Sequence, residues 1–143
     1  MLVKDVMNKN VVTIGPDVTV QEAAKKMVEE ETNFLIVTED EKLVGIVTEW
    51  DFVKKVAGEE EFKEKARLET IMTKKVIVIP PDIEVSEAAE IMSDNNIKKL
   101  PVVEDSNLIG VVTARDLLAA EPKMIESISK LFMSSKSQRP VAG

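Results

Sequence analysis

Two threonine–aspartate pairs in this chain have the residue types and the spacing to bind a ribonucleotide. Thr48 and Asp51 follow a Gly-Ile-Val run, and Thr113 and Asp116 follow a Gly-Val-Val run. An ionised aspartate has only acceptor oxygens, which suit the adjacent hydroxyls of a ribose, and a threonine hydroxyl can donate to a phosphate. Backbone N–H groups at the start of a helix favour the same anion. The pairs therefore predict sites for a ribose and its phosphates.

The same pattern also has a purely structural interpretation. Thr-x-x-Asp is a variant of the capping box, which stabilises the first turn of a helix without any ligand. Two copies in register favour a binding role. A duplication copies helix caps as faithfully as sites, however, so spacing alone leaves both interpretations open.

Both pairs belong to an internal duplication. A shift of 65 residues aligns 3–52 with 68–117 without a gap, and 20 of these 50 positions are identical. Two similar halves usually pack about a pseudo-twofold axis. We therefore expect a ligand site in the cleft between the repeats.

The elements that position the pairs follow from the apolar patterns. Each repeat is expected to run strand, helix, strand, strand, helix, preceded by a short apolar turn, which predicts an α/β (α+β) fold of two βαββα repeats in one compact, disc-like module. Thr19 and Glu22 predict a capping box at the start of the first long helix. The face of this helix expected to be buried comprises Val20, Ala23, Ala24, Met27 and Val28.

These patterns divide the chain into five predicted segments. They are a first repeat (1–58), a charged linker (59–67), a second repeat (68–121), an amphipathic helix (122–133) and a disordered tail (134–143). The helix after the second repeat carries an apolar stripe made of Met124, Ile125, Ile128, Leu131 and Phe132.

Composition excludes several classes of function. The chain has no cysteine and no histidine, so it lacks thiolate chemistry and the commonest general base. Its net charge of −7 argues against binding nucleic acid. No apolar run is long enough to span a membrane, and the first residues do not resemble a signal peptide, so we expect a cytoplasmic protein.

The repeat resembles the CBS domain, and the chain is similar to a free-standing tandem CBS pair, or Bateman module. The resemblance extends from Leu2 to Ala120. Its most specific features are an Asp-x-x-Val-x-x-Ala-Ala helix opening, the segment 96–103 (Asn-Ile-Lys-Lys-Leu-Pro-Val-Val) and the two Gly-x-x-Thr-x-x-Asp segments. The resemblance implies a disc-like pair whose clefts bind adenosine-containing ligands such as AMP, ADP, ATP or S-adenosylmethionine.

The resemblance also implies roles for individual residues. Asp51 and Asp116 would hold ribose hydroxyls, and Thr48 and Thr113 would approach the phosphates. The adenine contacts and the basic residues of the family correspond to the following positions: Thr13, Ile14 and Gly15 in the first repeat, and Val78, Ile79, Pro80, Lys98 and Lys99 in the second.

The two copies differ in charge. Arg115, Lys98 and Lys99 supply cations suited to phosphate beside the second pair. The first pair has Glu49 and Trp50 at the matching junction; the tryptophan could stack on a base or fill the cleft. The lysines could equally form a solvated strand edge. We expect the second copy to bind more tightly.

Three classes of function follow from these observations. The first is a regulatory sensor that binds an adenine nucleotide and relays its state to an effector protein or across a homodimer. The second is a ligand-free interaction or dimerisation scaffold. An enzyme is the least favoured, because the sequence shows no nucleophile–base set and no paired-carboxylate site. No metal or required cofactor is expected.

Overall fold

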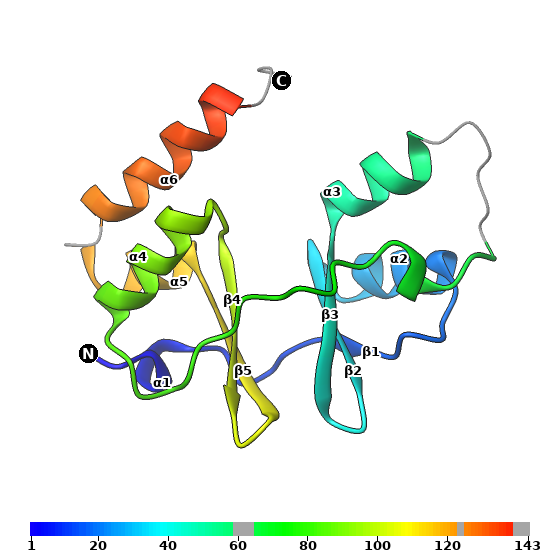
Figure 1. Ribbon diagram of the computed structural model, residues 1–143, viewed down its shortest axis with the longest axis horizontal. Helices are drawn as coiled ribbons and strands as arrows, with labels where there is room; N and C mark the ends of the chain where they lie inside the picture. The colour runs from blue at the N-terminus through cyan, green and yellow to red at the C-terminus, as the bar shows by residue number, and fades with distance from the viewer. Residues whose placement is uncertain (59–64, 123–124, 139–143) are drawn as a thin grey trace. The chain divides into compact units, whose positions relative to one another are not determined.

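The computed structural model describes residues 1–58, 65–122 and 125–138 and forms two compact units (Figure 1). The first-repeat unit comprises 11–76, and the second-repeat unit comprises 1–10 together with 77–143. Each unit combines helices with a small sheet. The predicted mixed fold with two repeats is therefore confirmed.

The first-repeat unit is built on a three-stranded sheet in the order β1-β2-β3. Strand β1 runs parallel to β2, and β2 is antiparallel to β3. Its elements are β1 (Thr13–Ile14), α2 (Val20–Glu29), β2 (Phe34–Glu39), β3 (Lys42–Thr48), α3 (Glu49–Phe52), the π-helical turn η1 (Val53–Ala57) and the 3₁₀ turn η2 (Leu68–Thr70).

The second-repeat unit repeats this plan and adds helices at both ends. Ile79 forms a parallel bridge to Val102 at the place of β1, so the first predicted strand is reduced to one bridge. The elements are α1 (Val3–Val6), α4 (Val85–Asn95), β4 (Lys99–Glu104), β5 (Asn107–Thr113), α5 (Ala114–Ala120) and α6 (Ile125–Gln138).

The two hairpins match residue for residue. The register shift between Val37 and Thr38 recurs between Val102 and Val103. The turns Asp40–Glu41 and Asp105–Ser106 have φ between 51° and 69° at both central positions, as a type I′ hairpin turn requires. The 65-residue duplication therefore preserves the backbone down to its left-handed residues.

The opening segment of each repeat packs on the hairpin of the other repeat. Asn8 and Val111 exchange two backbone hydrogen bonds of 2.8 and 3.0 Å, and Thr73 exchanges two of the same lengths with Ile46. Each segment thus extends the sheet of the unit that it joins. The sequence predicted a short apolar turn before each repeat, and the structure shows that this turn packs on the hairpin of the other repeat.

Glycine makes this close approach possible. A Cβ atom on Gly45 would lie 2.7 Å from the sulfur of Met72, and one on Gly110 would lie 2.7 Å from the sulfur of Met7. Contacts that short do not occur between relaxed atoms, so a side chain there would force the methionine to move and would press on a backbone carbonyl 3.0–3.1 Å away. The glycine of each Gly-x-x-Thr-x-x-Asp segment is therefore explained by packing.

Helix α2 confirms most of its predicted features. Thr19 and Glu22 form the capping box through hydrogen bonds of 2.9 and 3.1 Å. Val20, Ala23 and Met27 are buried, and Ala24 is half-buried. The prediction for Val28 was wrong, because its side chain is 78% exposed. Eight residues after Val20, it lies about 80° round the helix and leaves the buried face.

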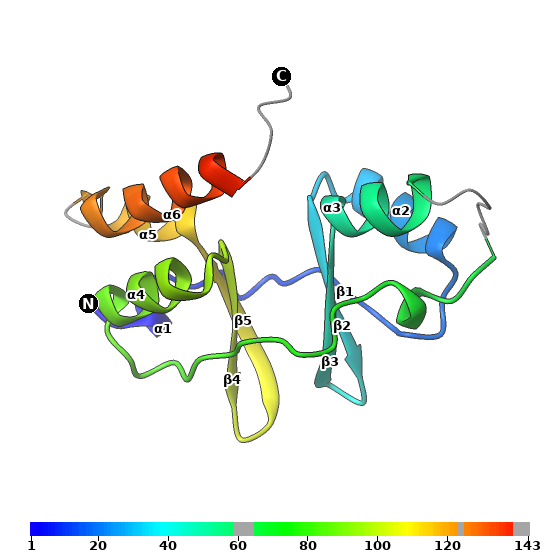
Figure 2. The same cartoon turned by 45° about the horizontal axis from the view of Figure 1, so that its top comes forward.

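The second-repeat unit buries part of the predicted C-terminal stripe. Ile128 and Leu131 are buried, and α6 packs against α4 and α5 (Figures 1 and 2). Ile125 and Phe132 are exposed. The helix continues to Gln138, past the predicted end, while Met124 of the stripe and 139–143 lie outside the described residues.

The structure describes only part of the predicted linker, 59–67. Most of the predicted linker, 59–64, lies outside the described residues. Its last residue, Arg67, forms a bridge with Thr19 and an ion pair of 3.7 Å with Asp17.

The described helices include none with the length and apolar character that a membrane span requires.

Candidate ligand-binding site

The first threonine–aspartate pair lies where β3 ends and α3 begins. The Thr48 N–H donates to Asp51 Oδ2 over 2.9 Å, and the Thr48 hydroxyl lies 3.4 Å from the same oxygen. The aspartate therefore closes the first turn of α3. Thr48 and Asp51 therefore cap the helix, as the structural interpretation of the motif predicted.

The second pair lies at the junction of β5 and α5, where it forms the same bond from the threonine N–H and one further bond to the threonine hydroxyl. The Thr113 N–H donates to Asp116 Oδ2 over 3.0 Å, and the Asp116 N–H donates to the Thr113 hydroxyl over 3.1 Å. Each copy thus uses one carboxylate oxygen, Oδ2, for the cap. Any ligand must be held chiefly by the other oxygen, Oδ1.

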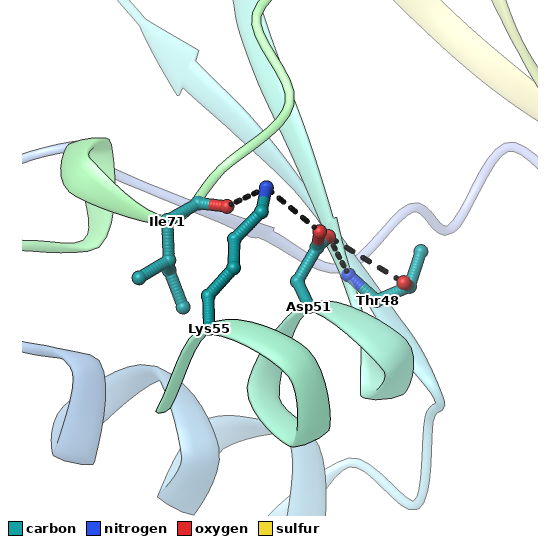
Figure 3. Close-up of polar contacts among 4 residues, drawn as sticks. All are labelled: Thr48, Asp51, Lys55 and Ile71. Carbon is teal, nitrogen blue, oxygen red and sulfur yellow. Dashed lines mark hydrogen bonds and ion pairs between the residues drawn. The ribbon is translucent and has the colours of Figure 1, made fainter. Parts of the chain in front are cut away.

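In the first copy, Oδ1 already has a cationic partner. Figure 3 shows the Lys55 ammonium between the carboxylate of Asp51 and the carbonyl of Ile71. The ammonium lies 3.1 Å from Asp51 Oδ1 and donates to Ile71 O over 2.7 Å. The Asp51 side chain is only 10% exposed. Protein groups therefore occupy both of its oxygens.

The second copy is more open. Asp116 is half-buried, and Ala120 lies four residues after it, at the position that Lys55 takes in the first copy. Within the described ranges, Asp116 has no ion pair and its Oδ1 accepts no hydrogen bond. One oxygen thus remains for an external donor.

The basic residues predicted for the second site start the neighbouring strand. Lys99 pairs with Thr113 across the hairpin, and the Lys98 carbonyl accepts from the Ala114 N–H over 2.9 Å. Strand pairing therefore brings Lys98, Lys99, Thr113 and the exposed Arg115 to the same end of β4 and β5.

Lys98 also has a partner outside the predicted site. Its ammonium lies 4.9 Å from the centre of the Phe132 ring on α6, within the range of a cation–π interaction. Sequence reasoning considered this lysine as a phosphate ligand or as part of a solvated strand edge, and did not predict this contact. The contact links the end of β4 to the C-terminal helix.

The residues predicted to contact adenine lie beside the hairpins. Ile79 is buried and pairs with Val102, whereas Val78 and Pro80 are exposed. In the first-repeat unit, Thr13 and Ile14 pair with β2, and Gly15 directly follows them. Each set thus belongs to the same unit as the threonine–aspartate pair of its own repeat.

Two aromatic or acidic residues distinguish the first copy. Glu49 and Trp50 open α3, and both are exposed. Trp50 is 50% exposed, so it is not a core residue. An exposed Glu49 side chain can turn toward water, so its charge alone does not close the site.

Lys55 is the residue that sequence reasoning missed. The alignment of the two repeats described above ends at Phe52, three residues before Lys55. Continuing the same 65-residue shift sets Lys55 against Ala120 and shows the difference without a structure. A charged residue four positions after a helix-opening aspartate faces it, which would have been the signal.

The site carries no sign of metal chemistry in the described part of the chain. No group of three or more carboxylates gathers there in a way that could hold a metal ion. Asp51 and Asp116 lie in equivalent caps of two different repeats, each with the other residues of its own copy.

Comparisons with known proteins agree with the fold and the repeat. The CBS domain family model matches 3–58 and 68–123. The uncharacterised protein MK0525 of Methanopyrus kandleri is 37% identical over 130 residues, which cover 90% of this chain and 66% of that protein. Enzymes such as a homoserine O-acetyltransferase of Methanohalobium evestigatum match over only 23% of their own length at 40% identity.

Solved structures give the same result. The CBS domain protein NE2398 has a TM-score of 0.77 at 31% identity and covers 84% of this chain and 96% of its own. The CBS domain pair of protein MJ0100, solved with 5′-methylthioadenosine and S-adenosyl-L-methionine, has a TM-score of 0.74 at 36% identity, over 84% of this chain and 98% of its own. The chain therefore belongs to the CBS domain family.

Proposed function

We propose that this chain is a regulatory module that binds an adenosine-containing ligand and relays its presence to a partner. The observation that carries the proposal is the pair of Thr-x-x-Asp caps in a CBS pair whose structural relative, the MJ0100 pair, was solved with two adenosine compounds. In the second-repeat unit, the cap leaves one carboxylate oxygen of Asp116 for a ligand.

The chemistry around Asp116 suits an adenosine. Its Oδ1 can accept hydrogen bonds from the adjacent hydroxyls of a ribose, one of which is missing in a deoxyribose. Arg115, Lys98 and Lys99 start the elements beside it and can neutralise a phosphate or a carboxylate on the ligand. Exposed Val78 and Pro80 offer apolar surface to a base in the same unit.

These groups favour two kinds of ligand. The cations favour AMP, ADP or ATP, and the MJ0100 relative favours S-adenosylmethionine or 5′-methylthioadenosine. The shared part is the adenosine, and we assign its ribose to Asp116, with Thr113 approaching any phosphate. The corresponding residues of the first copy are Asp51 and Thr48.

The regulatory part of the proposal needs two states with different affinity for the ligand. A homodimer or an effector protein would read the difference. The chain has no histidine and no cysteine, which favours regulation over catalysis. The enzymes that this chain matches are also covered by it over only 22–23% of their own length.

A ligand-free interaction scaffold is the second candidate. The exposed apolar side chains favour it, because they provide surface for another protein. Several of them lie on α3, the η1 turn and α6, among them Trp50, Val53, Ile125, Phe132 and Met133.

Thermal unfolding with added compounds separates the two candidates. A compound that binds only the folded chain raises its melting temperature by mass action. We expect at least one of AMP, ATP, S-adenosylmethionine and 5′-methylthioadenosine to do so, with adenine and deoxyadenosine as controls. No shift with any of the four at millimolar concentration would favour the scaffold.

The relay is tested separately. Hydrogen exchange at saturating ligand should change in segments away from the bound residues, and scattering should report any change in assembly. Unchanged exchange and scattering, with binding intact, would contradict the relay.

A further inference from the structure

We infer that Lys55 determines which of the two copies can take a ligand, because its ammonium closes Asp51 while Asp116 stays open. The inference rests on the proposed function and adds a specificity residue to it. It assigns ligand binding to the second-repeat unit and a structural role to the first pair.

The closure has two anchors. Lys55 contacts Asp51 Oδ1 over 3.1 Å and donates to the Ile71 carbonyl over 2.7 Å, so its ammonium is held from both sides (Figure 3). Ile71 follows the η2 turn and is buried. The lysine thus connects the site to a fixed point of the backbone.

The burial of the carboxylate adds to the closure. The Asp51 side chain is 10% exposed, and the lysine that covers it is 35% exposed. A ribose can reach Oδ1 only by displacing the ammonium. The displaced ammonium then loses a charge-assisted hydrogen bond, which is about twice as strong as a neutral one.

The second copy lacks each of these features. Ala120 carries no charge and no donor, and Asp116 keeps Oδ1 without a partner among the described residues. The bonds from the threonine N–H to the aspartate are alike in the two caps, at 2.9 and 3.0 Å. The charged partner of Oδ1 is therefore present in one copy and absent from the other through one side chain, Lys55 in place of Ala120.

A different role for Lys55 predicts a different result. If the lysine bound a phosphate of a ligand held by Asp51, its removal would weaken that ligand. The ion pair and the carbonyl contact already use the ammonium, which favours closure. A ligand without phosphate separates the two roles, because only closure affects it.

Calorimetric titration of the intact chain with 5′-methylthioadenosine tests the inference. We expect wild type to bind one equivalent, with binding lost in Asp116→Ala and kept in Asp51→Ala. Lys55→Met should add a second equivalent, and that equivalent should disappear in the double variant with Asp51→Ala. Lys54→Met, an exposed neighbour, is the control.

The reciprocal variant leaves the first copy untouched. Ala120→Lys places an ammonium four residues after Asp116, and we expect the affinity of the wild-type site to fall by roughly tenfold. Ala119→Lys adds the same charge at an exposed position and should leave the affinity within about twofold. This variant decides the matter even where Lys55→Met unfolds.

The outcomes are distinct. Two equivalent sites in wild type, or no second site in a folded Lys55→Met chain, would overturn the role of Lys55 and leave the proposed function standing. Weaker AMP binding in Lys55→Met would show that the lysine binds phosphate instead. No binding of any adenosine compound by wild type or by any variant would overturn the proposed function itself.

Discussion

The first and second threonine–aspartate pairs share a backbone and differ in what surrounds the carboxylate. Both aspartates accept the threonine N–H at nearly the same distance, 2.9 and 3.0 Å. Asp51 then meets Lys55, and Asp116 does not meet a matching cation within the described residues. The two copies thus share the helix cap, and they differ in whether the second carboxylate oxygen is available.

This difference changes how the motif is interpreted. A Thr-x-x-Asp segment at the end of a strand identifies a helix cap in both units, whether or not a ligand binds. Whether it is also a site depends on one residue, four positions later, which can fill the remaining oxygen. In the copy whose carboxylate oxygen stays open, Arg115 then adds a cation beside the aspartate.

The largest expected effect is on ligand affinity. Asp116→Ala removes the acceptor proposed for the ribose, and hydrogen bonds to a charged group contribute about 1.5–3 kcal/mol each, so affinity for 5′-methylthioadenosine should fall roughly a hundredfold. Asp51→Ala should change it less than about threefold. Calorimetry on both variants measures the contrast, and equal losses would remove it.

The second effect is on stability and has the opposite order. Asp51→Ala removes a cap and leaves Lys55 without its partner, so we expect a loss of about 2 kcal/mol in the free energy of unfolding, allowing for the exposure of the lysine. Asp116→Ala removes a cap alone and should cost about 1 kcal/mol. Urea unfolding without ligand compares them; a larger loss for Asp116→Ala would contradict the closed first copy.

The third effect should be the same in both units. Gly45→Ala and Gly110→Ala each push a Cβ atom into a methionine sulfur and a backbone carbonyl, and we expect each to cost about 1–3 kcal/mol. Gly15→Ala is the matched control, since nothing lies within 4 Å of its added carbon. Thermal unfolding that ranks Gly15→Ala with the other two would argue against the packing of the opening segments.

A smaller effect distinguishes the starts of α2 and α4. Thr19→Ala removes both hydrogen bonds of a capping box and should cost about 1 kcal/mol. Glu84 holds the matching position before α4 and makes no side-chain cap. Glu84→Ala removes only an exposed ion pair with the Met1 ammonium, so it should cost less in chemical unfolding near pH 7, and an equal or greater loss would contradict this.

The smallest effect depends on pH. The Met1 ammonium lies 3.0 Å from Glu84 Oε2, and this hydrogen bond, with the attraction of the carboxylate, raises the pKa of the ammonium above 8.0. The stabilisation is complete below pH 8.0 and is lost as the pH rises through the raised pKa. Melting temperatures of wild type and Glu84→Gln should converge above it; parallel curves would exclude the contact.

The sequence predicted the local parts of this fold well. Strand and helix order and the capping box at Thr19 follow from patterns within a few residues of one another. Val28 was the exception. It is exposed because the buried face of α2 is narrower than the apolar pattern indicated.

The exchange of opening segments could not be predicted in the same way. Both repeats offer nearly the same apolar segment and the same glycine, so pairing within a repeat and pairing between repeats look equal in sequence. Only the three-dimensional connection shows that Met7 packs on Gly110 and Met72 on Gly45. The contact of Lys98 with Phe132 is equally nonlocal.

A crystal structure grown with 5′-methylthioadenosine tests the central claim most directly. The account predicts the ribose on Asp116 Oδ1 in the second-repeat unit, with the ion pair between Lys55 and Asp51 intact. A ribose bound to Asp51, with Lys55 turned away from the carboxylate, would contradict it.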